Sequence, residues 1–407
     1  MPARSRPRVD AALLIYACTL AATTSGAKHN VLMIASDDMR PEMVTPAPAL
    51  RRAPPSFLLP PAPCVLTAAY TSTPPLPLTL TGRKSPYGHD YMATPNFQRL
   101  ADEGFFFRRT YVQMALCAPS RTVLLTGRRP DTSRVWAIGP YFRETTGRNW
   151  TSLPQAFKQA GYRAIGHGKI FHEGNASGFP LDQDAEFGAW SVPFFHPKVV
   201  YNTFNQTHPS PQPGVVKTPL SNVGIDAPWQ TFNDGQSAVR AAEWIANASA
   251  YTAPFFLAVG FHRPHIPYVY PQAFEYKGDV RFPPRDYAIT TGVPEVAPHD
   301  WTGEGSHYGD LAALRPNITA HDFQKNLTSL CSAVPLAVQA GMKRSYLSCI
   351  QYIDHLVGFL LDALRAADLY DDTHVIFWGD HGYGERPRPL ISRSLICPGR
   401  KLPRTCT

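Results

Sequence analysis

The chain has 407 residues, of which 44% are hydrophobic and 12% aromatic. This is enough to bury a core in one large domain or two ordinary ones, and it excludes a chain that is disordered as a whole. No internal apolar run approaches the roughly 20 residues that span a bilayer, and seven scattered cysteines without a Cys-x-x-Cys pair exclude a zinc ribbon or a small disulfide scaffold. The net charge of +8 is concentrated in residues 1–30, 44–84 and 385–407, so the pattern does not predict nucleic-acid binding.

Residues 1–27 have the three parts of a secretory signal peptide. Three arginines precede an apolar core at 11–22, and small residues at 25–27 provide a cleavage site. A mitochondrial presequence is the alternative interpretation. Six asparagines begin Asn-x-Ser/Thr sequons, which favours a glycosylated protein of the secretory pathway, lysosomal or extracellular. They are Asn149, Asn175, Asn205, Asn247, Asn317 and Asn326.

The first predicted element is a buried parallel strand at residues 30–35, which is followed by the acidic pair Asp37-Asp38. Acids at the carboxyl end of such a strand lie where α/β folds carry their sites. A helix is predicted from Pro95 to a stop at Gly104. Helices are also predicted at 153–160, 237–248 and 342–367, and strands at 162–166, 254–259 and 373–378. This alternation indicates a parallel or mixed sheet flanked by helices.

Two segments interrupt that alternation. Residues 44–84 hold ten prolines and no acidic residue, a composition that supports neither a strand nor a packed helix, so an extended or disordered insertion is predicted. Residues 385–407 form a short basic tail with four prolines and no periodicity. This tail follows a predicted strand that is expected to lie in the middle of the sheet.

The most informative stretch runs from Cys117 through Pro119 and Arg121 into an apolar helical pattern. A side chain at a helix start meets free backbone amides, and the guanidinium that follows adds positive charge, so the pattern predicts an anion site. For a lone Cys-x-Pro, a buried structural cysteine in a turn would be the alternative.

At its full length this stretch, Cys117-Ala-Pro-Ser-Arg-Thr-Val-Leu-Leu-Thr-Gly-Arg, resembles the signature of the formylglycine-dependent sulfatase family. Other matching strings are Gly168-Lys169-Ile-Phe-His172, Asp380-His381-Gly382 and His262-Arg-Pro-His265-Ile-Pro, the last similar to the iduronate-type branch. The resemblance implies an alkaline-phosphatase-like α/β fold, with a mixed sheet sandwiched between helices and a catalytic domain at 28–384. The implied reaction is hydrolysis of a sulfate ester on a glycosaminoglycan uronate.

The resemblance also implies roles for individual residues. Cys117 would be oxidised by the formylglycine-generating enzyme to formylglycine, an aldehyde whose hydrate supplies the nucleophilic oxygen and then expels sulfate by collapsing back to the aldehyde. Arg121 would orient the hydrate, and Lys169 with His172 would contact the sulfate or the nucleophile. His262 is the candidate acid for the departing sugar oxygen.

The implied metal is one Ca²⁺ per chain, held by Asp37, Asp38, Asp380 and His381 together with the hydrate at Cys117. Hard carboxylate oxygens suit Ca²⁺, while a histidine ligand is less usual for it and leaves other divalent ions as alternatives. His265, close to His262 in sequence, is equally well explained by a structural role.

The chain departs from the family pattern after Gly384. There the family continues with a Gly-Glu-His-Gly-x-Trp-x-Lys element, whose lysine contacts sulfate, and with a C-terminal subdomain; both are expected to be missing here. A pseudo-sulfatase is therefore the alternative, binding sulfated glycans through Arg121 and Lys169 without turnover. Within the enzyme class, the alternatives are a sulfatase for another carbohydrate and one for choline sulfate.

Overall fold

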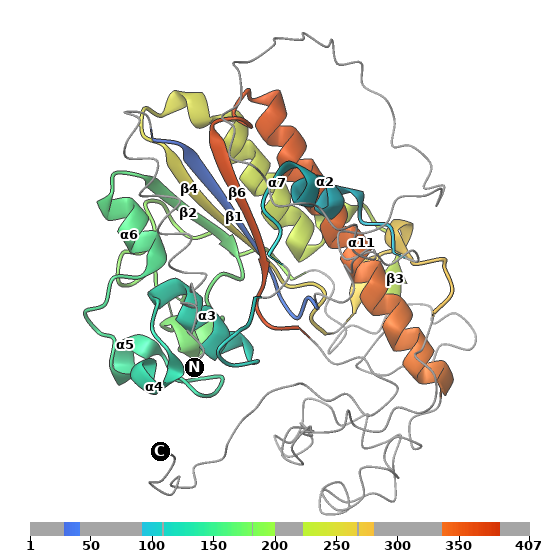
Figure 1. Ribbon diagram of the computed structural model, residues 1–407, viewed down its shortest axis with the longest axis horizontal. Helices are drawn as coiled ribbons and strands as arrows, with labels where there is room; N and C mark the ends of the chain where they lie inside the picture. The colour runs from blue at the N-terminus through green and yellow to red at the C-terminus, as the bar shows by residue number, and fades with distance from the viewer. Residues whose placement is uncertain are drawn as a thin grey trace, which may run out of the picture.

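The computed structural model describes residues 28–40, 92–107, 110–180, 182–199, 223–266, 268–280 and 336–382 (Figure 1). The predicted signal peptide at 1–27, the insertion at 44–84 and the tail at 385–407 lie outside these residues, as do Asn205, Asn317 and Asn326. Within the described residues, a central sheet separates two groups of helices (Figure 1).

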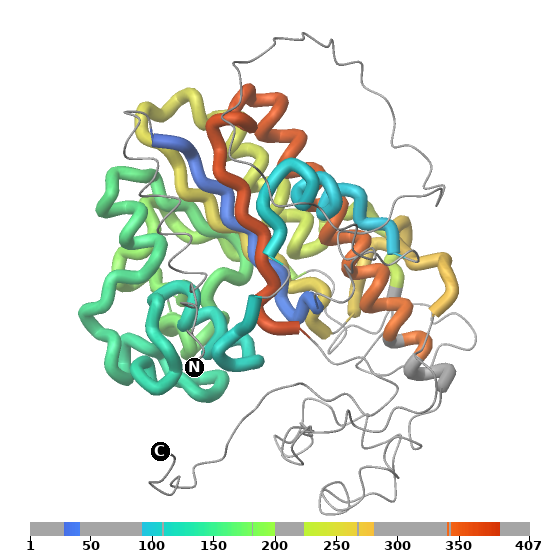
Figure 2. The backbone as a smooth tube through the Cα atoms, in the orientation of Figure 1, coloured from blue at the N-terminus to red at the C-terminus, as the bar shows by residue number. Residues whose placement is uncertain are grey.

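The central sheet contains β1 (Asn30–Ser36), β2 (Arg163–Gly168), β4 (Phe255–Phe261) and β6 (Thr373–Gly379), in the order β2-β4-β1-β6. All of its strand pairs are parallel, and the register places Ile34 opposite Val259 on one side and Phe377 on the other. The first strand in sequence therefore lies between β4 and β6 (Figure 2). Since the strands are parallel, their carboxyl ends meet at one edge of the sheet.

Both faces of β1 are buried, as its continuous apolar sequence predicts. Leu32 and Ile34 point into one hydrophobic cluster, and Val31 and Met33 point into the other. All four side chains are at most 1% exposed. Helices must therefore cover the sheet on both sides.

Helices α2 (Pro95–Glu103), α7 (Asn233–Ala246) and α11 (Leu336–Ala366) contribute to the first cluster. Helices α3 (Cys117–Thr126) and α6 (Leu153–Gln159) contribute to the second. The predicted strands and helices are thus confirmed, with boundaries shifted by a few residues. The sequence analysis missed the short helices α4 (Pro130–Ser133) and α5 (Phe142–Thr145) and the two-stranded parallel sheet of β3 (Val223–Ile225) and β5 (Val269–Pro271).

Helix α11 is a core helix. Contrary to the sequence prediction, its segment Lys343–Ala366 is long and apolar enough to cross a membrane by length and composition, but 72% of its most apolar window is buried within the protein. Asp354 on this helix also caps α2, because its carboxylate accepts hydrogen bonds from the backbone amides of Asn96 and Phe97, at 3.1 and 2.8 Å. The residue at the usual capping position, Thr94, makes no such bond.

Candidate active site

The ends of β1 and β6 bring two pairs of functional side chains together. Asp37 and Asp38 follow β1, and Asp380 and His381 follow β6, the adjacent strand. The amide of Asp380 donates to the carbonyl of Ser36 at 3.2 Å, and the amide of Asp38 donates to Asp380 Oδ1 at 3.0 Å. The parallel pairing of the two strands therefore fixes these residues relative to one another.

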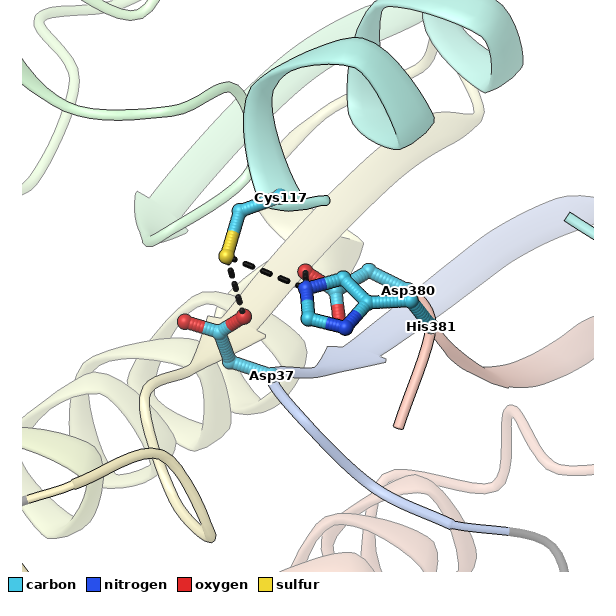
Figure 3. Close-up of side chains that lie close together, drawn as sticks. All are labelled: Asp37, Cys117, Asp380 and His381. Atoms are coloured by element: carbon cyan, nitrogen blue, oxygen red, sulfur yellow. Dashed lines mark hydrogen bonds and ion pairs between the residues drawn. The ribbon is translucent and has the colours of Figure 1, made fainter. Parts of the chain in front are cut away.

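Cys117 is the first residue of α3 and points at both strand ends (Figure 3). Its Sγ lies 3.4 Å from Asp37 Oδ1 and 3.1 Å from His381 Nε2. Ligand atoms of Asp37, Cys117, Asp380 and His381 all lie within 4.8 Å of one another. Cys117 is only 3% exposed, so its thiol is largely shielded from solvent.

Arg121, one turn into α3, is fully buried and joins three elements. Its Nε donates to Asp380 Oδ2 at 2.9 Å, and its Nη2 lies 3.6 Å from Asp37 Oδ1. Its Nη1 donates to the carbonyls of Lys169 and Ile170, at 2.5 and 3.0 Å. Burial would lower the pKa of Arg121, but Asp380 and Asp37 outweigh it and raise that pKa.

Lys169 follows β2, and its ammonium group forms a buried ion pair with Asp37. The backbone amide of Lys169 donates to the carbonyl of Gly260 on β4 at 3.0 Å. The approach is so close that a Cβ on Gly260 would lie 1.8 Å from the Lys169 carbonyl oxygen. Burial alone would raise the pKa of Asp37, but the charges of Lys169, His265 and Arg121 hold it well below its usual range.

Two histidines face Asp38. His381 Nε2 lies 3.3 Å from Asp38 Oδ1, and His265 Nε2 lies 3.8 Å from Asp38 Oδ2. Burial would lower the pKa of His265, but Asp38 and Asp37 raise it to about 9. His265, which the sequence left between a structural and a functional role, therefore lies next to a predicted metal ligand.

We call Asp37, Asp38, Cys117, Arg121, Lys169, Asp380 and His381 the strand-end cluster. Its carboxylates crowd one another: burial, together with the neighbouring Asp37, raises the pKa of Asp380 to about 6. A divalent cation relieves such repulsion, and aspartate oxygens with one imidazole are a suitable donor set for it. The chemistry and burial of these side chains therefore fit the metal that the sequence predicts.

His172 and His262 lie to one side of the cluster and meet at Glu173. His172 Nδ1 lies 3.0 Å from the Glu173 carbonyl oxygen, and His262 Nε2 lies 2.8 Å from Glu173 Oε1. Burial and the charge of Lys169 lower the pKa of His172 to about 4, so this imidazole is neutral at neutral pH. Glu173 thus contacts both histidines, and His172 also lies within the electrostatic influence of Lys169.

Sequence reasoning missed several residues that shape the site. Ser120, inside the cysteine motif, donates its hydroxyl to the Asp380 carbonyl at 2.5 Å. Glu173 adjoins a predicted site residue, and that position was the available signal. Asp234 accepts the backbone amide of His262 at 2.8 Å, and nothing in its local sequence indicates this contact.

The family model described as Sulfatase matches residues 79–394. The chain is 33% identical to human iduronate 2-sulfatase over 301 residues, which cover 73% of this chain and 52% of that protein. It is 28% identical to a sulfatase of Formosa agariphila (71% of this chain, 54% of that protein) and 26% to the choline-sulfatase of Rhizobium meliloti (75% and 56%). The chain spans about half the length of these curated relatives.

Solved structures confirm the fold. The phosphonate monoester hydrolase of Agrobacterium radiobacter aligns with a TM-score of 0.52 and 19% identity, over 88% of this chain and 63% of that one. A protein solved with its substrate D-glucosamine-2-N,6-O-disulfate gives a TM-score of 0.52 at 16% identity, over 88% and 66%. The predicted alkaline-phosphatase-like α/β fold is present, and all described strand pairs are parallel. Fold, cysteine motif and family match agree: the chain belongs to the sulfatase family.

Proposed function

We propose that this protein hydrolyses a sulfate ester on a glycosaminoglycan uronate, with formylglycine derived from Cys117 and one bound Ca²⁺. The observation that carries the proposal is the convergence of Cys117, Asp37, Asp380 and His381 within 4.8 Å, beside two buried cationic side chains. An acidic metal site next to a reactive position and fixed positive charge suits an anionic substrate.

Formylglycine and a divalent cation would supply part of this chemistry. Formylglycine in its hydrated form provides an oxygen nucleophile, which the thiol of Cys117 does not. A divalent cation would polarise sulfate oxygens. Asp37, Asp380 and His381 would hold it, together with Asp38, which lies 3.3 Å from His381 Nε2.

The chain's own cations prepare the site for an anion. Lys169 pairs with Asp37, and Arg121 bridges Asp37 and Asp380, so both cations are fixed before any substrate arrives. Their positions avoid the cost of reorganising flexible charges during the reaction. In this proposal Lys169 binds the sulfate. Arg121 fixes the start of α3 relative to the carboxylates of Asp37 and Asp380.

A departing sugar oxygen needs a proton, and His262 is our candidate donor. It follows β4 directly, and the last residue of β4, Phe261, accepts the backbone amide of Asp37 at 3.2 Å. His262 thus lies on the chain segment adjacent to the cluster. His172, held neutral at neutral pH, contacts the sulfate in this proposal.

The uronate is the finer part of the proposal. It rests on relatives named iduronate 2-sulfatase in human and mouse, which are 33% and 32% identical to this chain. A substrate panel tests it: a disaccharide with a 2-sulfated uronate, glucosamine 6-sulfate and choline sulfate. Fastest sulfate release from the uronate supports the assignment, and fastest release from either of the others replaces it.

We also propose the secretory pathway, lysosomal or extracellular, as the location. Among the described residues, the sequon asparagines Asn149, Asn175 and Asn247 are all exposed. Attached glycans at these positions would therefore not disturb the core. Expression in a secreting cell, followed by glycosidase treatment and electrophoresis, tests this point, and an unchanged mobility contradicts it.

The decisive experiment follows the aldehyde and the product together. The full chain is expressed with the formylglycine-generating enzyme, labelled with a hydrazide probe, and assayed for sulfate release. We expect labelling at position 117 with turnover, and loss of both in Cys117→Ser. An unlabelled chain that binds sulfated disaccharide without releasing sulfate identifies a binding protein instead. Full activity in Cys117→Ser overturns the mechanism.

A further inference from the structure

The imidazole of His262 lies between two carboxylates. Nε2 is 2.8 Å from Glu173 Oε1, in the segment after β2, and Nδ1 is 3.4 Å from Asp234 Oδ1, in the first turn of α7. Neither carboxylate belongs to the strand-end cluster. We call Glu173, Asp234 and His262 the rim clamp.

Asp234 is the fixed side of the clamp. Its side chain is fully buried, and its two oxygens accept the backbone amides of His262 and Arg263, at 2.8 and 3.0 Å. The Asp234 carboxylate therefore fixes the backbone directly after β4 and also faces the His262 ring. A substitution of Asp234 would disturb the backbone as well as the ring, so it cannot test the protonation of the ring separately.

Glu173 is the movable side. Its side chain is 45% exposed, whereas that of His262 is 18% exposed. Two further residues that follow β2, Lys169 and His172, interact electrostatically with Glu173. Because the exposed carboxylate of Glu173 is held by one short contact, to His262, an entering ligand can displace it without disrupting the core.

We propose that Glu173 is a positioning residue for His262. Together with Asp234 on the other side of the ring, it holds His262 as a doubly protonated imidazolium. When the ester binds, its leaving-group oxygen displaces Glu173 from Nε2. This inference rests on the proposed function for the last step and on the described contacts for the rest. His262 Nε2 lies within hydrogen-bond distance of Glu173, whereas Nδ1 contacts Asp234 at 3.4 Å without a hydrogen bond. A carboxylate on each side of the ring favours its charged form.

The proton transfer balances without a further reactant. In the proposed reaction, sulfur forms a bond to the oxygen nucleophile at position 117 as its bond to the sugar oxygen breaks. The electron pair of the broken bond stays on the sugar oxygen, which takes the Nε2 proton of His262. The nucleophile releases its own proton to solvent, and solvent returns one proton to the neutral imidazole when Glu173 closes again. Glu173 itself gains and loses no atom.

The charges around the ring support this arrangement. Burial would lower the pKa of His262, but Glu173 and Asp234 outweigh it and raise that pKa to about 9. Burial would raise the pKa of Glu173, but His262 and Lys169 hold it at about 2. An acid with a pKa near 9 is a poor donor at neutral pH, and displacement of Glu173 strengthens it when substrate is in place.

The test is a titration of the full chain without substrate. Histidines are labelled with ¹³C at Cε1, the His262 signal is assigned by its loss in His262→Gln, and its pKa is measured by NMR. Glu173→Gln keeps the size and a hydrogen-bond acceptor but removes the charge. We expect the pKa of His262 to fall by about one unit or more in this variant. Glu186→Gln, at an exposed glutamate outside the site, should leave it unchanged.

An unchanged His262 pKa in Glu173→Gln overturns the proposal. Kinetics provide a second measure: the basic limb of the kcat/KM profile should move to lower pH by the same amount, and Glu173→Asp should restore part of the shift. If the chain releases no sulfate, the proposed function fails, while the NMR titration still decides whether Glu173 controls His262.

Discussion

The strand-end cluster and the rim clamp are adjacent but built differently. In the cluster, the side chains of Arg121, Asp37 and Asp380 are fully buried, and Arg121 contacts segments from three parts of the sheet. In the clamp, Glu173 is 45% exposed and holds His262 through a single short contact. The cluster is thus fixed by the fold, whereas the outer half of the clamp is free to respond to a ligand.

Under the proposed function, this difference suits the two halves of a sulfate ester. The sulfate is the part that every substrate of this class shares, and a rigid, buried site can be matched to it. The alcohol varies in shape and must leave, so its side of the site benefits from a partner that can move. Each of the following predictions tests whether the two regions really differ in rigidity.

Arg121→Leu should have the largest effect. It leaves the buried carboxylates of Asp37 and Asp380 without their shared partner, and we expect a loss of about 3–5 kcal/mol in the free energy of unfolding. Urea denaturation measures it. The matched control is Arg240→Leu on α7, where the arginine side chain is 47% exposed and pairs with Glu243 at 2.6 Å; about 1 kcal/mol or less is expected there. Equal losses would mean that the cluster is not the more rigid region.

Gly260→Ala should come next. A Cβ would lie 1.8 Å from the Lys169 carbonyl oxygen, so the backbone that carries Lys169 has to move. We expect a loss of about 3 kcal/mol by denaturation, the upper end for overpacking, together with loss of sulfate binding. The control is Gly127→Ala, where φ is +64° but a Cβ meets nothing within 4 Å, so only about 1–2 kcal/mol should be lost. Unaltered sulfate binding in Gly260→Ala would contradict the close-packed position of Lys169.

Calcium should stabilise the cluster and leave the clamp unaffected. At a Ca²⁺ concentration 100 times its Kd, binding to the folded chain adds about 2.7 kcal/mol, measured as a rise in melting temperature over a chelator-treated sample. Asp38→Asn removes a predicted ligand charge and should reduce that rise, whereas Glu173→Gln should retain it. A full rise in Asp38→Asn would remove Asp38 from the metal site.

Glu173→Gln should have the smallest effect on stability. Because the glutamate is 45% exposed, solvent screens its ion pair with His262, and we expect a change of about 0.5 kcal/mol or less in the same denaturation experiment. A loss above about 2 kcal/mol would show that Glu173 supports the fold, and the contrast between cluster and clamp would disappear.

The cluster was predictable because its residues carry local signals. Asp37 and Asp380 each follow an apolar run of strand length, and Cys117 opens a helix in a distinctive motif. Parallel strands end at the same edge, so the sequence pattern was enough to bring these residues together. The same reasoning predicted the helices on both faces of β1.

The clamp was not predictable, because its contacts depend on tertiary placement alone. Glu173 and His262 are 89 positions apart. Asp234 contacts His262 from the first turn of α7, where an acidic residue is common and does not indicate a distant partner. Asp354 is a similar case: it lies inside a long apolar helix, yet caps α2 from a distance of 258 positions. Periodicity identifies the element that carries such a residue but not the partner it meets.

The position of β6 at the end of the described chain has a consequence for maturation. Asp38 and Asp380 are 342 positions apart, and Cys117 precedes His381 by 264. During synthesis, Cys117 therefore emerges long before the strand that completes its surroundings. Until β6 pairs with β1, the thiol lacks His381 and Asp380 beside it, and afterwards it is 3% exposed. The Cys117 thiol is therefore more accessible to a modifying enzyme in that interval than after folding.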